Sequence, residues 1–233
     1  MWVAGADACK AGWFVVLRQL PSGVLRSRSV VSFGHLVRLP EKPRVLAVDI
    51  PIGLLDRAEP GGRQCDREAR ELLGWPRRNS VFSPPVHSAL DCVGYSAALR
   101  ENRRSSELRV GISKQTFGLF EKLREARSNM TPLLQTRIYE IHPELSFFLM
   151  ARRPLEHSKK EIAGQRERKA MLRGFSPVVR RFEVGRWPGV GWDDCLDACA
   201  ACWTAARIAR GVALRFPRRR VRDSRGLRME IWR

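Results

Sequence analysis

A carboxylate closes a strand-like run of apolar residues in the first quarter of the chain. The run RVLAVDIPIG, residues 44–53, is apolar and rich in β-branched side chains without alternation, which is typical of a strand covered on both faces. Asp49 stands near its end, where burying a carboxylate without a partner costs free energy. Pro51 holds Ile50 in an extended conformation and ends the strand there. The run therefore predicts a central strand that ends on an unexplained acid.

The segments before this run predict an antiparallel meander. Residues 1–7, 13–20 and 24–33 read as strands separated by glycine-containing turns, and HLVRL at 35–39 is a short helix candidate. The central strand then follows through a crossover.

Helical patterns dominate the rest of the sequence. We expect helices at 65–74, 96–105, 114–128, from near Ser158 to 175, and at 192–211. Residues 74–90 and 176–191 read as loops because of their prolines and glycines, and TRIYEIHPE predicts a strand that ends on Glu140. The simplest organisation is a single domain over residues 1–233, with a mainly helical insertion at about 74–130.

The charge balance points to a polyanionic partner. Lys and Arg number 43 against 24 Asp and Glu, for a formal net charge of +19. Such a surplus favours nucleic acid, although an arginine-heavy genome would raise the charge without any partner. No apolar run approaches ~18 residues, and Asp7 and Lys10 interrupt the N-terminus where a signal peptide needs its apolar region. We expect a soluble, cytoplasmic protein with no membrane partner.

Three cysteines near the C-terminus are spaced as C-x3-C-x2-C. On a loop, this spacing is able to ligate an iron–sulfur cluster, but Cys195, Cys199 and Cys202 lie in an Ala- and Leu-rich helical pattern. There the three thiols share one stripe, so core packing is the prediction.

Acidic residues recur where the expected elements end or begin. They are Asp7, Asp49, Glu140, Asp193, Asp194 and Asp197. In an open α/β sheet the carboxyl ends of the strands line the ligand crevice, and helix residues at i, i+3 and i, i+4 share a face. Clustered carboxylates repel one another unless cations compensate them, and oxygen ligands favour Mg²⁺ or Mn²⁺. Two such ions ~3.5–4 Å apart would activate a water against a phosphodiester.

Each acid also has a structural alternative. Asp7 precedes a turn and fits an Asx cap, whereas Asp193 or Asp194 fits the N-cap or first turn of the last helix. For Asp49 and Glu140 a purely structural role is less well supported, because neither is expected at a helix N-terminus whose dipole would stabilise a carboxylate.

Nine motifs follow one another from Gly5 to Arg233: GADACKAGW, AVDIPIG, GRQCDREARELLG, RRNSVF, SKQTFGLFEKLRE, YEIHPELSF, HSKKEIAGQRER, DDCLDACAACWTA and RGLRMEIWR. In these motifs the chain resembles the domain-of-unknown-function 429 family, whose members are regarded as predicted nucleases of ribonuclease H-like fold.

This resemblance implies an α/β, ribonuclease H-like fold with a five-stranded mixed central sheet flanked by helices. By position, Asp7 matches the first-strand acid of that fold, Asp49 the fourth-strand acid, and Asp194 or Asp197 the helix acid. Glu140 would be a family-specific addition.

Further polar residues of these motifs are candidates for the site. His142 fits a proton shuttle or metal ligand, or equally a hydrogen-bonded structural histidine. Lys114, Lys159 and Lys160 fit phosphate binding, with solvated lysines as the alternative. Arg63, Asp66 and Arg67 fit a substrate clamp, with ordinary ion pairing slightly favoured.

The leading functional hypothesis is a divalent-metal-dependent nuclease. Its catalytic residues would be Asp7, Asp49, Glu140, Asp194, His142 and Lys159; its metal ligands Asp7, Asp49, Glu140, Asp194 and Asp197; and its substrate-binding residues Lys114, Lys160, Arg63 and Arg67. A non-catalytic nucleic-acid-binding protein of the same fold is the main alternative. An actin-like or sugar-kinase-type phosphotransferase is disfavoured, because the chain lacks paired glycine-rich phosphate loops.

Overall fold

The computed structural model describes all 233 residues, which divide into two compact units. The first, here the sheet unit, comprises residues 1–50, 136–214 and 232–233. The second, the helical unit, comprises residues 51–135 and 215–231. The helical unit contains the whole stretch 74–130 that the sequence marks as an insertion, and it extends beyond that stretch on both sides.

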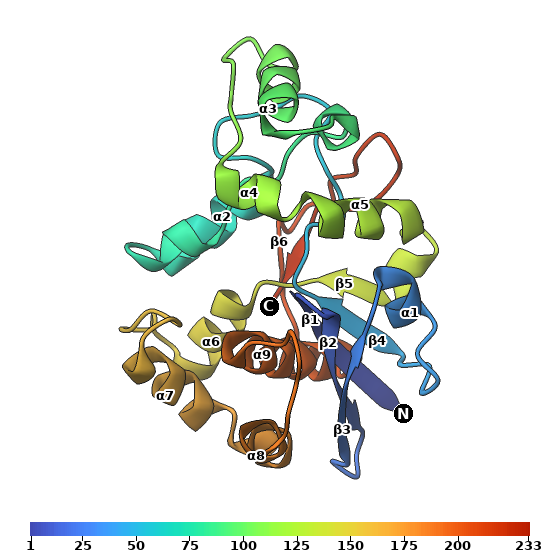
Figure 1. Ribbon diagram of the computed structural model, residues 1–233, viewed down its shortest axis with the longest axis vertical. Helices are drawn as coiled ribbons and strands as arrows, with labels where there is room; N and C mark the ends of the chain where they lie inside the picture. The colour runs from blue at the N-terminus through green and yellow to red at the C-terminus, as the bar shows by residue number, and fades with distance from the viewer. The chain divides into compact units, whose positions relative to one another are not determined.

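A mixed five-stranded sheet is the centre of the sheet unit (Figure 1). Its strands are β1 (Trp2–Cys9), β2 (Gly12–Gln19), β3 (Leu25–Val30), β4 (Val45–Val48) and β5 (Ile138–Glu140), in the order β3-β2-β1-β4-β5. The first three strands are antiparallel, whereas β4 pairs parallel with β1 and β5 parallel with β4. The predicted meander, crossover and α/β class are confirmed, and the strand order is consistent with a ribonuclease H-like sheet.

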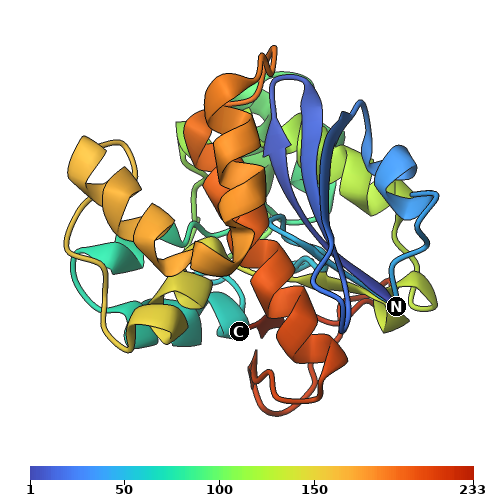
Figure 2. The same cartoon turned by 90° about the horizontal axis from the view of Figure 1, so that it is seen from below.

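Helices cover both faces of this sheet (Figure 2). The helices of the unit are α1 (Phe33–Val37), α6 (Pro143–Ala151), α7 (Ile162–Met171), α8 (Ser176–Val184) and α9 (Trp192–Ala209), with a 3-10 turn η4 (Arg173–Phe175). α9 packs on β1, β2 and β4, and α1 lies on the other face. Even α9, the longest helix, lacks the sustained apolar length of a bilayer span, as do all the others.

The pleat of the strands assigns side chains to these two faces. Phe14 and Val16 of β2 belong to the core cluster on the α9 side, whereas Trp13 packs edge-on against Phe33 of α1. The helix side of this core includes Cys195, Cys199 and Cys202, which are fully buried free thiols. The predicted cysteine stripe is therefore confirmed as core packing.

The helical unit is built mainly from short helices. They are α2 (Gln64–Leu73), α3 (Tyr95–Arg104), α4 (Lys114–Gly118) and α5 (Phe120–Asn129), with 3-10 turns η1 (Arg77–Ser80), η2 (Ser88–Asp91) and, at its boundary, η3 (Leu134–Thr136). Two short strands, β6 (Arg215–Phe216) and β7 (Ile231–Trp232), pair with each other near the C-terminus.

Three helix predictions need correction. The sequence predicts a loop over residues 176–191, but residues 176–184 form α8. Pro177 is compatible with this helix because it lies in the first turn, where its missing N–H is harmless. The sequence pattern also did not predict α6, because its apolar residues do not recur with a helical period. The helix start is nevertheless marked, since His142 is the N-cap and Pro143 the first helical residue. α7 begins at Ile162 rather than near Ser158.

Candidate metal centre

Three carboxylates from three elements meet in the sheet unit. Asp7 lies on β1, Asp49 directly follows β4, and Asp197 lies in the second turn of α9. One carboxylate oxygen of each lies within 4.8 Å of the others. Asp7 and Asp197 are buried, and Asp49 is half-buried. This cluster, here the aspartate cluster, is the only group of its kind in the chain.

Strand alternation explains why two of these side chains point to α9. Val3 of β1, and Val45 and Ala47 of β4, belong to the core cluster beneath α9. Since every second residue of a strand faces the same side, Asp7 and Asp49 face α9 as well.

Gly5 lets the helix approach closely enough to complete the cluster. A Cβ on Gly5 would stand 2.0 Å from the Cys202 nitrogen and 2.5 Å from the Ala198 carbonyl oxygen. The backbones of β1 and α9 are thus in direct contact next to the first turns of the helix, where Asp197 lies. The absence of one side chain sets the distance between Asp7 and Asp197.

Lys159 supplies a positive charge to the cluster. Its Nζ lies 2.7 Å from Asp197 Oδ2 and 3.9 Å from Asp193 Oδ2, and its side chain remains 39% exposed. At such distances an ammonium offsets part of the repulsion between carboxylates. The lysine therefore acts as the built-in counter-ion of Asp197.

A buried arginine holds the segment that carries Lys159. Arg168 of α7 is 1% exposed, donates to the carbonyl oxygens of His157 (3.2 Å) and Gly164 (3.1 Å), and pairs with Glu144 of α6. Gly164 adds a second close contact, because a Cβ there would lie 1.9 Å from the Ser158 carbonyl oxygen. The sequence pattern does not predict this arrangement. The only signal in the sequence was that EIHPE carries acids and GQRER carries arginines within two of the motifs.

Burial and mutual repulsion disfavour ionisation of the cluster. Burial, then the charges of Asp49 and Asp197, hold the pKa of Asp7 well above its usual value. Burial likewise raises the pKa of Asp197, and it raises the pKa of Asp49 to about 6. Partial burial alone would lower the pKa of Lys159, but Asp197, Asp7 and Asp49 outweigh it and raise that pKa. The site therefore disfavours the negative charge of three ionised aspartates and stabilises the positive charge of Lys159.

These shifts predict how stability changes with pH when no divalent cation is present. The pKa of Asp49 is higher in the folded chain, about 6 against the ordinary 3.8. Protonated Asp49 therefore stabilises the fold fully below pH 4, and this stabilisation is lost as pH rises through 6. Asp7 and Asp197 act in the same direction. We expect urea denaturation in EDTA to show a lower free energy of unfolding at pH 8 than at pH 5. Asp49 alone should account for about 1–2 kcal/mol of this difference. Saturating Mn²⁺ should remove this loss, whereas higher stability at pH 8 in EDTA would contradict the shifts.

Two predicted ligands do not join the aspartate cluster. Asp194 Oδ2 instead accepts from the Gly191 N–H at 2.7 Å and caps α9, so Asp197 is the helix acid of the cluster. Glu140 is buried, but Tyr139 and Ile141 on either side of it pack in the core cluster beneath α9. The pleat therefore turns Glu140 to the opposite face of the sheet.

Two other predicted residues lie near the cluster in the sheet unit. His142 Nδ1 accepts from the Glu144 N–H at 3.3 Å and caps α6, and the imidazole lies close enough to Asp49 to act on the pKa of that carboxyl. Lys160 is exposed beside Lys159.

The remaining predicted substrate-binding residues lie in the helical unit. Arg63 is 1% exposed in a bidentate pair with Asp66 and donates to the Gly53 carbonyl oxygen, so it supports a loop rather than presenting a surface. Arg67 is exposed and pairs with Glu59, and Lys114 is exposed at the start of α4.

Comparison with known proteins places the chain in a family. Residues 5–222 match the family described as protein of unknown function (DUF429). No curated protein and no solved structure matches the chain. The matched span includes the whole aspartate cluster and Lys159. Because the match covers nearly the entire sequence, the chain belongs to the DUF429 family.

Proposed function

We propose that this protein is a divalent-metal-dependent nuclease that hydrolyses phosphodiester bonds of DNA or RNA. The aspartate cluster carries the proposal, since three carboxylates converge on one point from two strand ends and a helix. The strand order that delivers them and the formal charge of +19 support it. We further propose that the protein acts in the cytoplasm, where its six cysteines would remain thiols.

The donor set fits a hard divalent cation. All three residues offer carboxylate oxygens, which suit Mg²⁺ or Mn²⁺ and leave coordination positions for water and phosphate oxygens. Asp7, Asp49 and Asp197 would hold the ion. When bound, such an ion polarises a phosphoryl oxygen and lowers the pKa of a water.

Neighbouring side chains fit the remaining tasks. The exposed part of Lys159 is placed to bind a phosphate oxygen, and Lys160 beside it would add a second positive charge. His142, close to Asp49, is positioned to take or deliver a proton at its imidazole.

One observation favours a second candidate, a non-catalytic nucleic-acid-binding protein. Lys159 already neutralises Asp197 at 2.7 Å, so the cluster has a compensating charge without any metal. In that protein, the aspartates and Lys159 would form a structural network only.

A substrate panel separates the two candidates. Single-stranded and double-stranded DNA, RNA, hybrid and branched substrates are incubated with Mg²⁺ or Mn²⁺, and again with EDTA. Cleavage of at least one substrate that EDTA abolishes is the expected result. Binding without cleavage of any substrate would favour the second candidate.

Replacing Lys159 by methionine should separate cation binding from cleavage. The variant removes a positive charge that competes with the cation for Asp197, so we expect calorimetry to show about tenfold tighter Mn²⁺ binding. Cleavage should fall, because the phosphate loses its ammonium partner. Without a cation the variant should lose roughly 1–3 kcal/mol of stability, since Asp197 is left buried and unpaired.

Lys160→Met is the matched control for this variant. It removes the same charge from the adjacent, exposed residue, and Mn²⁺ affinity should stay within about twofold of the parent chain. Weaker Mn²⁺ binding by Lys159→Met would show that the lysine does not compete with the ion.

A further inference from the structure

The helical unit contains an arginine-rich segment that the proposed metal centre does not use. Residues 215–228, here the arginine segment, contain seven arginines and a single acid: Arg215, Arg218, Arg219, Arg220, Arg222, Asp223, Arg225 and Arg228. We propose that this segment is a sequence-independent binding surface for the phosphate backbone of nucleic acid. The inference rests on the proposed function for the class of polyanion, and it adds a second point of attachment.

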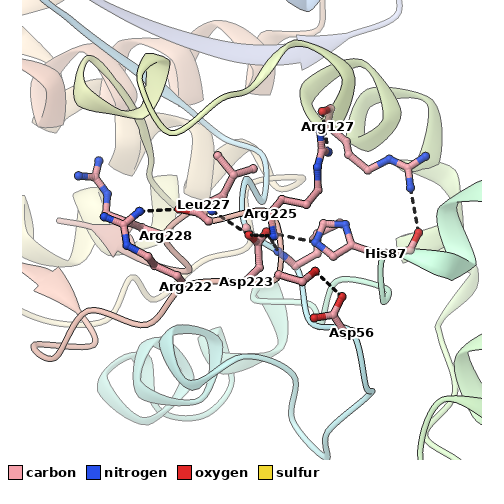
Figure 3. Close-up of polar contacts among 12 residues, drawn as sticks. Asp56, His87, Arg127, Arg222, Asp223, Arg225, Leu227 and Arg228 are labelled. Carbon is pink, nitrogen blue, oxygen red and sulfur yellow. Dashed lines mark hydrogen bonds and ion pairs between the residues drawn. The ribbon is translucent and has the colours of Figure 1, made fainter.

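The lone acid of the segment fixes its turn (Figure 3). Asp223 Oδ1 accepts from the N–H groups of Arg225 (3.0 Å) and Leu227 (2.8 Å), and Oδ2 accepts from Leu54 N–H (3.2 Å) and lies 3.1 Å from His87 Nε2. Burial alone would raise the pKa of Asp223, but the bonds from His87, Leu227 and Leu54 outweigh it and lower that pKa. This carboxylate therefore anchors the turn, and its hydrogen bonds go to backbone N–H groups and to His87 rather than to an arginine side chain.

Both ends of the segment are anchored in the same unit. Arg215 and Arg228 pair with the buried Glu230 at 3.1 and 2.9 Å. Gln135 donates to the Arg228 carbonyl oxygen (2.8 Å) and accepts from the Arg228 N–H (2.6 Å). Arg225 adds a bond to the Arg127 carbonyl oxygen. The segment is held at its turn and at both ends, which distinguishes it from a solvated basic tail.

The middle of the segment carries unneutralised charge. Arg218, Arg219 and Arg220 are consecutive and exposed, and none has an acidic partner in the structure. Their planar guanidinium forks match phosphate oxygens and remain charged at any accessible pH.

The composition of this surface selects a nucleic-acid backbone over other anions. No exposed large apolar side chain falls within residues 215–228, so the segment lacks the anchor that would insert into a membrane surface. It also lacks an exposed aromatic ring on which a base would stack. Contacts to phosphates position a protein on nucleic acid without distinguishing the base sequence, so binding by this segment would be independent of sequence.

Salt dependence of duplex binding tests the proposal. Binding of a fluorescent 30-base-pair duplex DNA is measured in EDTA, where cleavage is suppressed, between 50 and 300 mM salt. A variant with Arg218, Arg219 and Arg220 changed to Gln should bind on the order of 10²-fold more weakly at 0.1 M salt, with a log–log slope smaller by about 2–3. The matched control changes the exposed Arg100, Arg103 and Arg104 of α3 to Gln, which removes the same charge from the same unit. Its slope should change by less than about 1.

Several results would overturn the inference. One is an equal loss of duplex affinity in the two triple variants, or a log–log salt slope in the Arg218, Arg219 and Arg220 variant that equals that of the parent chain. Others are a parent chain that does not bind the duplex, or binding to phosphatidylserine vesicles that depends on the same three arginines. Asp49→Asn keeps this test separate from the proposed function. That variant should retain duplex binding while cleavage is lost, so a failed metal site and a failed arginine segment give different results.

Discussion

Asp49→Asn is expected to lower metal-dependent cleavage by on the order of 10³-fold or more while the chain still folds. The substitution keeps the size of the side chain but removes one of the three charges that would hold the cation. Calorimetry should show Mn²⁺ affinity lost in parallel with the rate. Because burial raises the pKa of Asp49 to about 6, the neutral amide should also stabilise the metal-free protein at pH 8.

Glu140→Gln is the matched control for this prediction. Glu140 ends the neighbouring strand and is buried, but the pleat turns it to the other face of the sheet. Its variant should keep cleavage within about tenfold of the parent chain and should retain Mn²⁺ binding. Cleavage that survives in Asp49→Asn and disappears in Glu140→Gln would refute the assignment of the cluster.

Gly5→Ala is expected to destabilise the protein by at least about 3 kcal/mol. The added Cβ would stand 2.0 Å from one backbone atom of α9 and 2.5 Å from another, and backbone cannot rotate away as a flexible side chain does. The helix must therefore shift away from β1. Since that shift also separates Asp7 from Asp197, any variant that remains folded should bind Mn²⁺ more weakly.

Gly118→Ala provides the comparison for this loss. Gly118 lies in α4 with nothing within 4 Å of the Cβ position, so alanine should be neutral or stabilising by up to about 1 kcal/mol. Thermal denaturation of both variants, with and without Mn²⁺, measures the difference. Equal midpoints would show that the contact between β1 and α9 tolerates a methyl group.

Local patterns were sufficient for the strands of the central sheet. Apolar and β-branched runs separated by turns identify the meander, and the run that ends on Asp49 identifies the central strand, because burial on both faces removes alternation. The same reasoning failed at α8, where Pro177 was interpreted as a helix breaker although the first turn of a helix accepts proline.

The sequence by itself determined that Asp7 and Asp49 each lie near the end of a strand, since apolar and β-branched runs are local features. That these two strands are neighbours was implied only by the resemblance to the family, and the structure shows it in the pairing of β1 with β4. Only the tertiary structure decided which other charges join them. Asp197 rather than Asp194 enters the cluster, because the first turn of α9 uses Asp194 as its cap. Lys159 reaches Asp197 from 38 residues away along the chain. Such a contact depends on how helices pack on a sheet, and no local pattern carries that information.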